Sequence, residues 1–135
     1  ANPNIKAKDG KTALDLALES GRTGIVSSLV SSGGDVNAVT ANGVTPIMYA
    51  AANGNAANVR TLALRGADVN AKDMYGFTPV IYAAEYGRLD ALKELIAYGG
   101  NFALRDNNGL SPLAHAKANN HTEVVDFLRR IGAPE

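Results

Sequence analysis

Two stretches that lie 33 residues apart decide the fold: NGVTPIMYAAANGN, residues 42–55, and YGFTPVIYAAEYGR, residues 75–88. The same pattern occurs one period earlier as DGKTALDLALESGR, which begins at Asp9, and one period later as NGLSPLAHAKANNH, which begins at Asn108. A fixed period of this length indicates a repeat architecture, in which each unit is one small supersecondary structure. We therefore predict a single domain over residues 1–135 with four units, at about 5–37, 38–70, 71–103 and 104–135.

Each unit is predicted to hold two short helices. In the third unit, Thr78 offers a hydroxyl at the helix N-cap and Pro79 fits the first helical position. Gly87 is expected to end this helix, because glycine takes the left-handed conformation without steric cost. The second helix carries apolar residues at helical spacing, such as Leu92 and Leu95, and a turn rich in Asp, Asn and Gly follows it. One such unit is too small to bury its apolar faces alone, so the units must stack.

The composition excludes several classes of protein. Hydrophobic residues make up 46% of the chain, which is typical of a globular protein, and Lys plus Arg number 13, as do Asp plus Glu. Because a chain that neutralises phosphates normally has a basic excess or a basic patch, we expect no nucleic-acid partner. The longest apolar stretch, 47–52, is too short to span a bilayer, so we expect no membrane partner, and no signal-peptide pattern is found. The absence of cysteine excludes disulfides and thiolate zinc sites and leaves the compartment open.

The sequence contains no pattern for catalysis, cofactor binding or metal binding. The two histidines, His115 and His121, are six residues apart and do not share one helical face. DNNG from Asp106 is similar to the start of a calcium loop, but the twelfth position holds Lys117 where a bidentate glutamate is required. The G-x-S-x-G, H-E-x-x-H and phosphate-loop motifs do not occur. We therefore expect no enzyme, no cofactor and no metal.

The segments GVTPIMYAA, residues 43–51, and LRGADVNAKD, residues 64–73, closely resemble the ankyrin repeat, and the resemblance extends over essentially the whole chain. It implies an all-α solenoid of stacked antiparallel helix pairs, with β-turn fingers at right angles to the helices and a concave inner face. It also implies a protein-binding scaffold without catalysis, whose partner contacts lie on the inner helices and the finger tips.

The chain departs from the family pattern at several positions. Asp15, Met48, Ile81 and Ala114 replace the histidine that usually follows the TPL segment, so the inter-repeat hydrogen bonds of that histidine must be absent or differently supplied. The fourth unit has Asn120 where the helix-ending glycine belongs.

The two ends of the repeat array differ. Lys117, Arg129 and Arg130 stand where the middle units have apolar residues, and charge at these places suits a solvated terminal cap. ANPN, residues 1–4, is in phase with ADVN, residues 67–70, and we expect it to be the tail of a preceding repeat. The alternative is an arm that packs on the first unit.

Six of the eight aromatic residues lie in the third unit. Repeat phase places Met74, Tyr75 and Phe77 on its finger and Tyr86 at the end of its inner helix, which are places that the family uses for binding. Because aromatic residues and methionine are enriched at interface centres, we expect these four side chains to form one exposed, partner-binding cluster. The alternative is that the fingers pack these rings on one another. The rim of the site is expected to come from neighbouring fingers, with Asn42, Val44, Asn107, Asn108 and Leu110.

These observations predict a non-catalytic scaffold that binds another protein through the fingers and concave face of repeats 2–4 and is a monomer when free. The ending VVDFLRRIGAPE, residues 124–135, resembles that of small bacterial ankyrin proteins, some of which inhibit or protect a partner enzyme. An inhibitor or immunity role is therefore the sharpest version of the prediction. The alternative is an adaptor or targeting segment of a larger multidomain protein. The cytoplasm and the bacterial periplasm both suit such a soluble chain.

Overall fold

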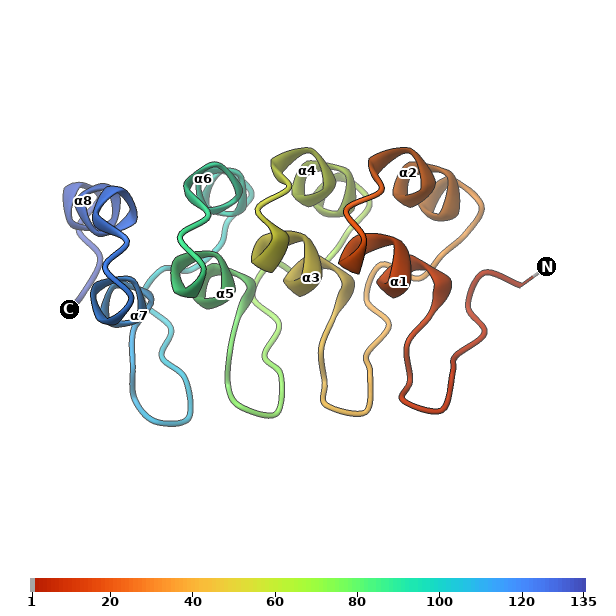
Figure 1. The fold of residues 1–135 in the computed structure, drawn as a ribbon, viewed down its shortest axis with the longest axis horizontal. Helices are drawn as coiled ribbons and strands as arrows, with labels where there is room; N and C mark the ends of the chain where they lie inside the picture. Colours follow the sequence, from red (N-terminus) through yellow and green to blue (C-terminus); the bar gives the residue numbers. More distant parts are fainter. Residues whose placement is uncertain (1) are drawn as a thin grey trace.

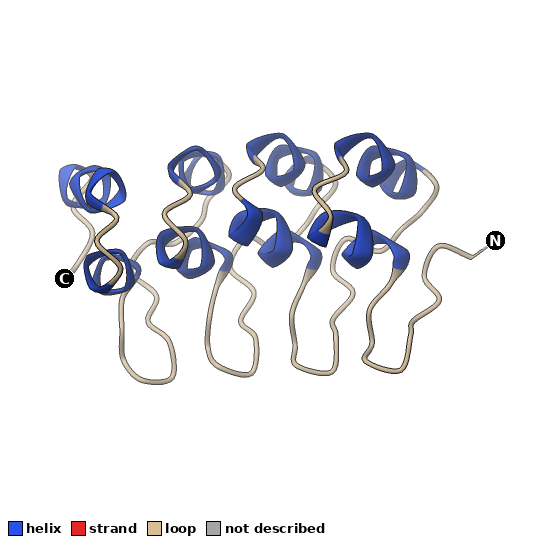
Figure 2. Cartoon of the chain, viewed as in Figure 1, coloured by secondary structure: helices blue, strands red, loops and turns tan. Residues whose placement is uncertain are grey.

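The computed structural model describes residues 2–135, and Figure 2 shows that this part of the chain consists of helices joined by loops and turns, without strands. The helices follow one another in four pairs: α1 Ala13–Glu19 and α2 Thr23–Ser31, α3 Pro46–Asn53 and α4 Ala56–Leu64, α5 Pro79–Glu85 and α6 Leu89–Ala97, α7 Pro112–Ala118 and α8 Thr122–Arg130. The all-α prediction is confirmed.

The eight helices of residues 2–135 form two rows (Figure 1). The inner row holds α1, α3, α5 and α7, and the long loops that precede these helices project from it as fingers. The outer row holds α2, α4, α6 and α8. Each inner helix packs on its outer partner, and the inner helices also pack on one another in succession. This is the stacked solenoid that the sequence predicts.

Polar side chains cap the N-termini of the inner helices. The hydroxyl of Thr78 accepts a hydrogen bond from the Ile81 N–H at 3.2 Å, and that of Ser111 accepts one from the Ala114 N–H at 3.1 Å. Each of these bonds satisfies a backbone donor that has no partner within the helix.

Two of the residues that replace the family's histidine take part in capping instead. The carboxylate of Asp15 accepts a hydrogen bond from the Thr12 N–H at 3.0 Å, and Met48 Sδ lies 3.4 Å from the Thr45 nitrogen. The polar contacts of Asp15 and Met48 therefore lie within their own unit rather than between repeats.

Asparagine side chains join consecutive units in a regular series, which we call the asparagine ladder. Each ladder asparagine donates from Nδ2 to a glycine carbonyl of the next unit at 3.1 Å, and accepts at Oδ1 a backbone N–H two residues beyond that glycine at 2.7–2.8 Å. The members are Asn4 with Gly33 and Asp35, Asn37 with Gly66 and Asp68, and Asn70 with Gly99 and Asn101.

The ladder stops at the junction of the third and fourth helix pairs. The next position in phase is Ala103, which has no side-chain amide, and the residue that would donate to it is Pro134, which has no backbone N–H. The 33-residue spacing of the rungs supports our proposal that the units are bounded at 37/38, 70/71 and 103/104. Asn4 makes the same contacts as Asn37, which fits the phase expected for residues 1–4, and Ala1 lies outside the described residues.

Alanine allows the inner helices to approach closely. Ala50 and Ala83 are fully buried, as is Ala116 one period later. Larger side chains such as Leu62 and Leu95 fill the space beside them and are also fully buried. Apolar burial therefore runs from one unit into the next, as the stacking argument requires.

Asn120 occupies the glycine position of the fourth unit without changing the backbone conformation there. Its φ is 60°, close to the 70° of Gly87 in the third unit. Asparagine is one of the residues that tolerate this left-handed region. The replacement of glycine by Asn120 therefore leaves the helix end almost unchanged.

Charged side chains surround the C-terminal end of the array. Lys117 and Arg129 are exposed, and both contact the carboxylate of Glu135, at 3.1 and 3.5 Å respectively. Their exposure agrees with the solvated cap that the sequence predicts.

We expect Asn70→Ala to lower the free energy of unfolding by about 1–2 kcal/mol, because it removes two hydrogen bonds that connect neighbouring units. Urea denaturation followed by circular dichroism measures the effect. Lys72→Ala, an exposed neighbour of the same rung, is the control. Equal stability of Asn70→Ala and wild type would show that the ladder contributes nothing to stability.

Asn58→Val should raise the free energy of unfolding by about 1 kcal/mol. Asn58 is fully buried in α4, and neither its Oδ1 nor its Nδ2 has a hydrogen-bond partner within residues 2–135. An unsatisfied buried amide is costly, and Val124 stands at the corresponding buried position of α8. Thermal unfolding of Asn58→Val and of Asn58→Asp, which adds a buried charge and should be less stable than wild type, tests this. A melting temperature of Asn58→Val below that of wild type contradicts it.

Candidate functional site

Three of the four side chains predicted to form the partner-binding cluster are exposed. Met74, Tyr75 and Tyr86 expose 56%, 59% and 52% of their areas. Phe77 differs, because it is half-buried: its ring centroid lies 5.2 Å from that of Tyr82 and 5.0 Å from that of His115. Phe77 therefore does not belong to an exposed cluster as expected, and its ring packs on two other rings instead.

Asp73 fixes the shape of the third finger. Its Oδ1 accepts hydrogen bonds from the Tyr75 N–H at 2.9 Å and the Phe77 N–H at 3.0 Å. Its Oδ2 accepts a hydrogen bond from the Tyr82 hydroxyl, which ties the finger to α5. The backbone that carries Tyr75 is thus held by a buried carboxylate.

Asp106 holds the fourth finger in the same way. Its Oδ1 accepts the N–H groups of Asn108 and Leu110 at 2.9 and 3.0 Å, and its Oδ2 lies 2.8 Å from Nε2 of His115. Burial alone would raise the pKa of Asp106, but the hydrogen bonds from Leu110, His115 and Asn108 hold it below its ordinary value.

The third and fourth fingers and α5 enclose a shallow hollow, which we call the glutamate depression. Tyr75 and Phe77 come from the third finger, Asn107 and Asn108 from the fourth, and the remaining side chains from α5 and its C-cap. The lining residues are Tyr75, Phe77, Tyr82, Glu85, Tyr86, Asn107 and Asn108. It therefore contains five of the nine residues predicted to bind the partner.

A second hollow, the tyrosine depression, lies beside it between α3 and α5. Its lining residues are Val44, Met48, Tyr49, Ala52, Tyr82 and Tyr86, so Tyr82 and Tyr86 belong to both depressions. Burial raises the pKa of Tyr49 to about 12, and burial together with the Asp73 hydrogen bond raises that of Tyr82. Both phenols are neutral at physiological pH, so the tyrosine depression is an uncharged, largely apolar surface.

The other three predicted residues lie outside both depressions. The Asn42 carbonyl accepts a hydrogen bond from the Met74 N–H at 3.0 Å, and the Met74 carbonyl accepts one from Nδ2 of Asn107 at 2.9 Å. Asn42 and Met74 therefore join adjacent fingers, although the Met74 side chain is exposed. Leu110 exposes 44% of its area at the base of the fourth finger.

His115 is part of the site, which the sequence analysis missed. Its Nδ1 lies 2.5 Å from Oε2 of Glu85 and its Nε2 lies 2.8 Å from Oδ2 of Asp106, so the ring joins α5 to the fourth finger. Each ring nitrogen of His115 therefore faces a carboxylate oxygen. The available signal was repeat phase, because His115 follows Tyr82 by one period and each faces the aspartate of its own finger.

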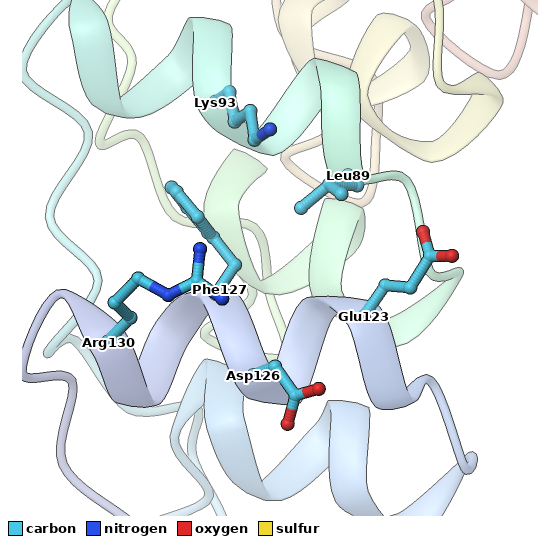
Figure 3. Close-up of a pocket in the computed structure, with 6 residues that line it drawn as sticks. All are labelled: Leu89, Lys93, Glu123, Asp126, Phe127 and Arg130. Carbon is cyan, nitrogen blue, oxygen red and sulfur yellow. The ribbon is translucent and has the colours of Figure 1, made fainter.

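A pocket on the opposite, outer row has a different character (Figure 3). It lies between α6 and α8 and is lined by Leu89, Lys93, Glu123, Asp126, Phe127 and Arg130. Lys93 Nζ is 5.6 Å from the centroid of the Phe127 ring. Charges of both signs on exposed helix surfaces are typical of a solvated face.

Neither a metal-binding cluster nor a membrane-spanning helix is found in residues 2–135. Within residues 2–135, no group of three or more His, Cys, Asp or Glu side chains is placed to hold a metal ion. In the same range, no helix has the length and apolar character needed to cross a membrane.

Comparison with known families agrees with the geometry. A family model described as ankyrin repeats, in three copies, matches residues 1–73 and 72–133. The chain belongs to the ankyrin-repeat family, whose members are generally protein–protein interaction scaffolds and typically lack catalytic activity. No curated protein matches the chain.

The stabilising contribution of the Asp106 carboxylate should be lost in acid. Since its pKa in the folded state is depressed below 3.8, the contribution is fully present above about pH 4 and falls as the pH drops through the folded-state pKa. Urea denaturation of wild type and Asp106→Asn between pH 2 and 6 at constant ionic strength measures it. We expect the stability difference between them to shrink toward pH 2; a difference that grows with acidity would contradict the assignment.

Proposed function

We propose that the chain is a non-catalytic binding protein whose partner, another protein, seats on the fingers and inner-helix side of repeats 2–4. The observation that carries the proposal is the exposure of Tyr75 and Tyr86 at the two depressions. Each exposes more than half of its area, and neither hydroxyl makes a hydrogen bond within residues 2–135. Exposed tyrosines beside an apolar hollow are characteristic of the centre of a protein interface.

The corresponding positions of the neighbouring units support this reading. Where the third unit has Tyr86, the second has Asn53 and the fourth has Asn119. Asn53 Nδ2 donates to the Leu18 carbonyl, and Asn119 Nδ2 donates to the Glu85 carbonyl at 3.2 Å. Tyr86 makes no such bond to the preceding unit, so the third unit replaces a structural amide by an exposed ring.

The charges of this face favour a protein over a nucleic acid. The residues that line the two depressions include one carboxylate, Glu85, and no basic side chain. The chain as a whole has a formal net charge of zero. A phosphate backbone would meet no cation in these hollows, whereas an apolar centre with amide groups at its edge suits a protein surface. We further propose that the free chain is a monomer.

The finer role that we propose is inhibition of, or protection against, a partner enzyme. Its support is the resemblance of residues 124–135 to the ending of small bacterial ankyrin proteins. Activity of a captured partner enzyme, measured with and without one equivalent of this chain, tests the role. Unchanged activity of a saturated complex would favour the adaptor alternative.

Tyr75→Ala and Tyr86→Ala should each cost about 2 kcal/mol or more of binding free energy, which is the usual loss at an interface hot spot. Their melting temperatures should stay close to that of wild type, because both rings are mostly exposed. The partner is captured on the immobilised wild-type chain, identified by mass spectrometry and titrated against each variant by calorimetry.

Tyr98→Ala is the matched control, since Tyr98 is an exposed tyrosine at the end of α6 in the outer row. Asn42→Ala and Asn108→Ala at the rim should cost less than about 1 kcal/mol. Phe77→Ala is a poor test, because loss of its packing on Tyr82 and His115 should also lower stability. The proposed site is wrong if Tyr75→Ala and Tyr86→Ala bind the partner as tightly as Tyr98→Ala.

A further inference from the structure

We infer that the glutamate depression is a subsite for an arginine side chain of the partner. This inference rests on the proposed function and adds to it the chemical class of one contacting residue. Three features of the depression carry it: an accessible carboxylate oxygen, aromatic walls, and the amide groups at its edge.

Glu85 supplies the anionic acceptor. Its Oε2 faces Nδ1 of His115, while its Oε1 makes no hydrogen bond within residues 2–135, and its side chain exposes 30% of its area. The two neighbouring carboxylates are engaged: Asp73 accepts from Tyr75, Phe77 and Tyr82, and Asp106 accepts from Asn108 and Leu110 and faces His115. Glu85 is thus the carboxylate that has an oxygen left for a ligand.

Three basic residues near the depression in sequence have partners elsewhere. Arg88 Nε donates to the Ala52 carbonyl at 2.9 Å, and Lys117 pairs with Glu135. Arg105 donates to the carbonyls of Gly109 and Glu135. Within residues 2–135, the one salt-bridge contact of Glu85 is that of its Oε2 with His115, so a partner that brings a cation to Oε1 gains a charge-assisted hydrogen bond.

The aromatic walls of the glutamate depression favour binding of a guanidinium group over an ammonium group. Tyr75 and Tyr86 present largely exposed rings, and an aromatic face attracts a cation. A guanidinium group is planar, stacks on such rings and is less strongly hydrated than an ammonium group. Its further N–H groups can donate to the amide oxygen of Asn108 at the edge, whose side chain makes no hydrogen bond within residues 2–135.

The test uses Nα-acetyl-arginine amide as the probe, titrated into the ¹⁵N-labelled full chain at constant ionic strength and followed by NMR chemical shifts. We expect saturable shifts centred on Tyr75, Glu85 and Tyr86. The citrulline analogue, which has the same shape without the charge, should bind at least about tenfold more weakly, and the lysine analogue at least about threefold more weakly.

Two variants locate the site. Glu85→Gln keeps the shape and the contact to His115 and should weaken arginine binding about tenfold. Tyr86→Ala leaves His115 untouched and should weaken it about threefold, so the test does not depend on the folding of one variant. Asp126→Asn removes an exposed charge of α8 and should bind the probe like wild type. Equal affinities for arginine and citrulline, shifts centred elsewhere, or unchanged binding to both Glu85→Gln and Tyr86→Ala would overturn the inference.

The experiments distinguish an error in the arginine subsite from an error in the proposed function. If the captured partner loses affinity for Tyr75→Ala and Tyr86→Ala but binds Glu85→Gln like wild type, the surface is correct and the arginine subsite is wrong. If the probe binds as expected while the partner is indifferent to all three changes, the subsite exists and the proposed partner surface is wrong.

Discussion

The two hydrogen bonds that each ladder asparagine makes to the next unit fix the register of the first three helix pairs, and the rest of the structure depends on that register. Asn37 and Asn70 bind a carbonyl and an N–H of the following turn, so neighbouring units cannot slide without breaking both bonds. Single backbone bonds, such as that from the Asn107 N–H to the Tyr75 carbonyl, then align the fingers. The glutamate depression exists because two aligned fingers face one inner helix.

The candidate site lies where side chains depart from the structural pattern of the other units. Tyr86 replaces an amide that elsewhere bonds to the preceding unit, and Tyr75 stands where the neighbouring fingers have Asn42 and Asn108. The surrounding scaffold stays intact, because Asp73 and Thr78 hold the finger and the start of α5 as their counterparts do in the fourth unit. A repeat protein can therefore change one unit's surface without altering its stacking.

The fold and part of the site were predictable because both follow from local chemistry repeated at a fixed period. Caps such as Thr78, glycine at helix ends and the exposure of Met74, Tyr75 and Tyr86 all follow from repeat phase. The half-burial of Phe77 and the link from His115 to Glu85 did not follow, because they depend on contacts between residues 38 and 30 positions apart. Whether a ring meets solvent or another ring is decided by the neighbour's side chain, which phase alone does not supply.

Because the ladder has no rung between the third and fourth units, we expect this junction to be less stiff than the two junctions that have one. At that junction the ladder pair is Ala103 and Pro134, whereas the opposite side is held by Asn107, Asn119 and the His115–Glu85 contact. A load that bends the solenoid should therefore open this junction on the outer row, between α6 and α8, about an axis close to Glu85. Tyr75 and Asn108 lie on the two fingers beside this axis, so the glutamate depression should keep its width while the outer helices separate.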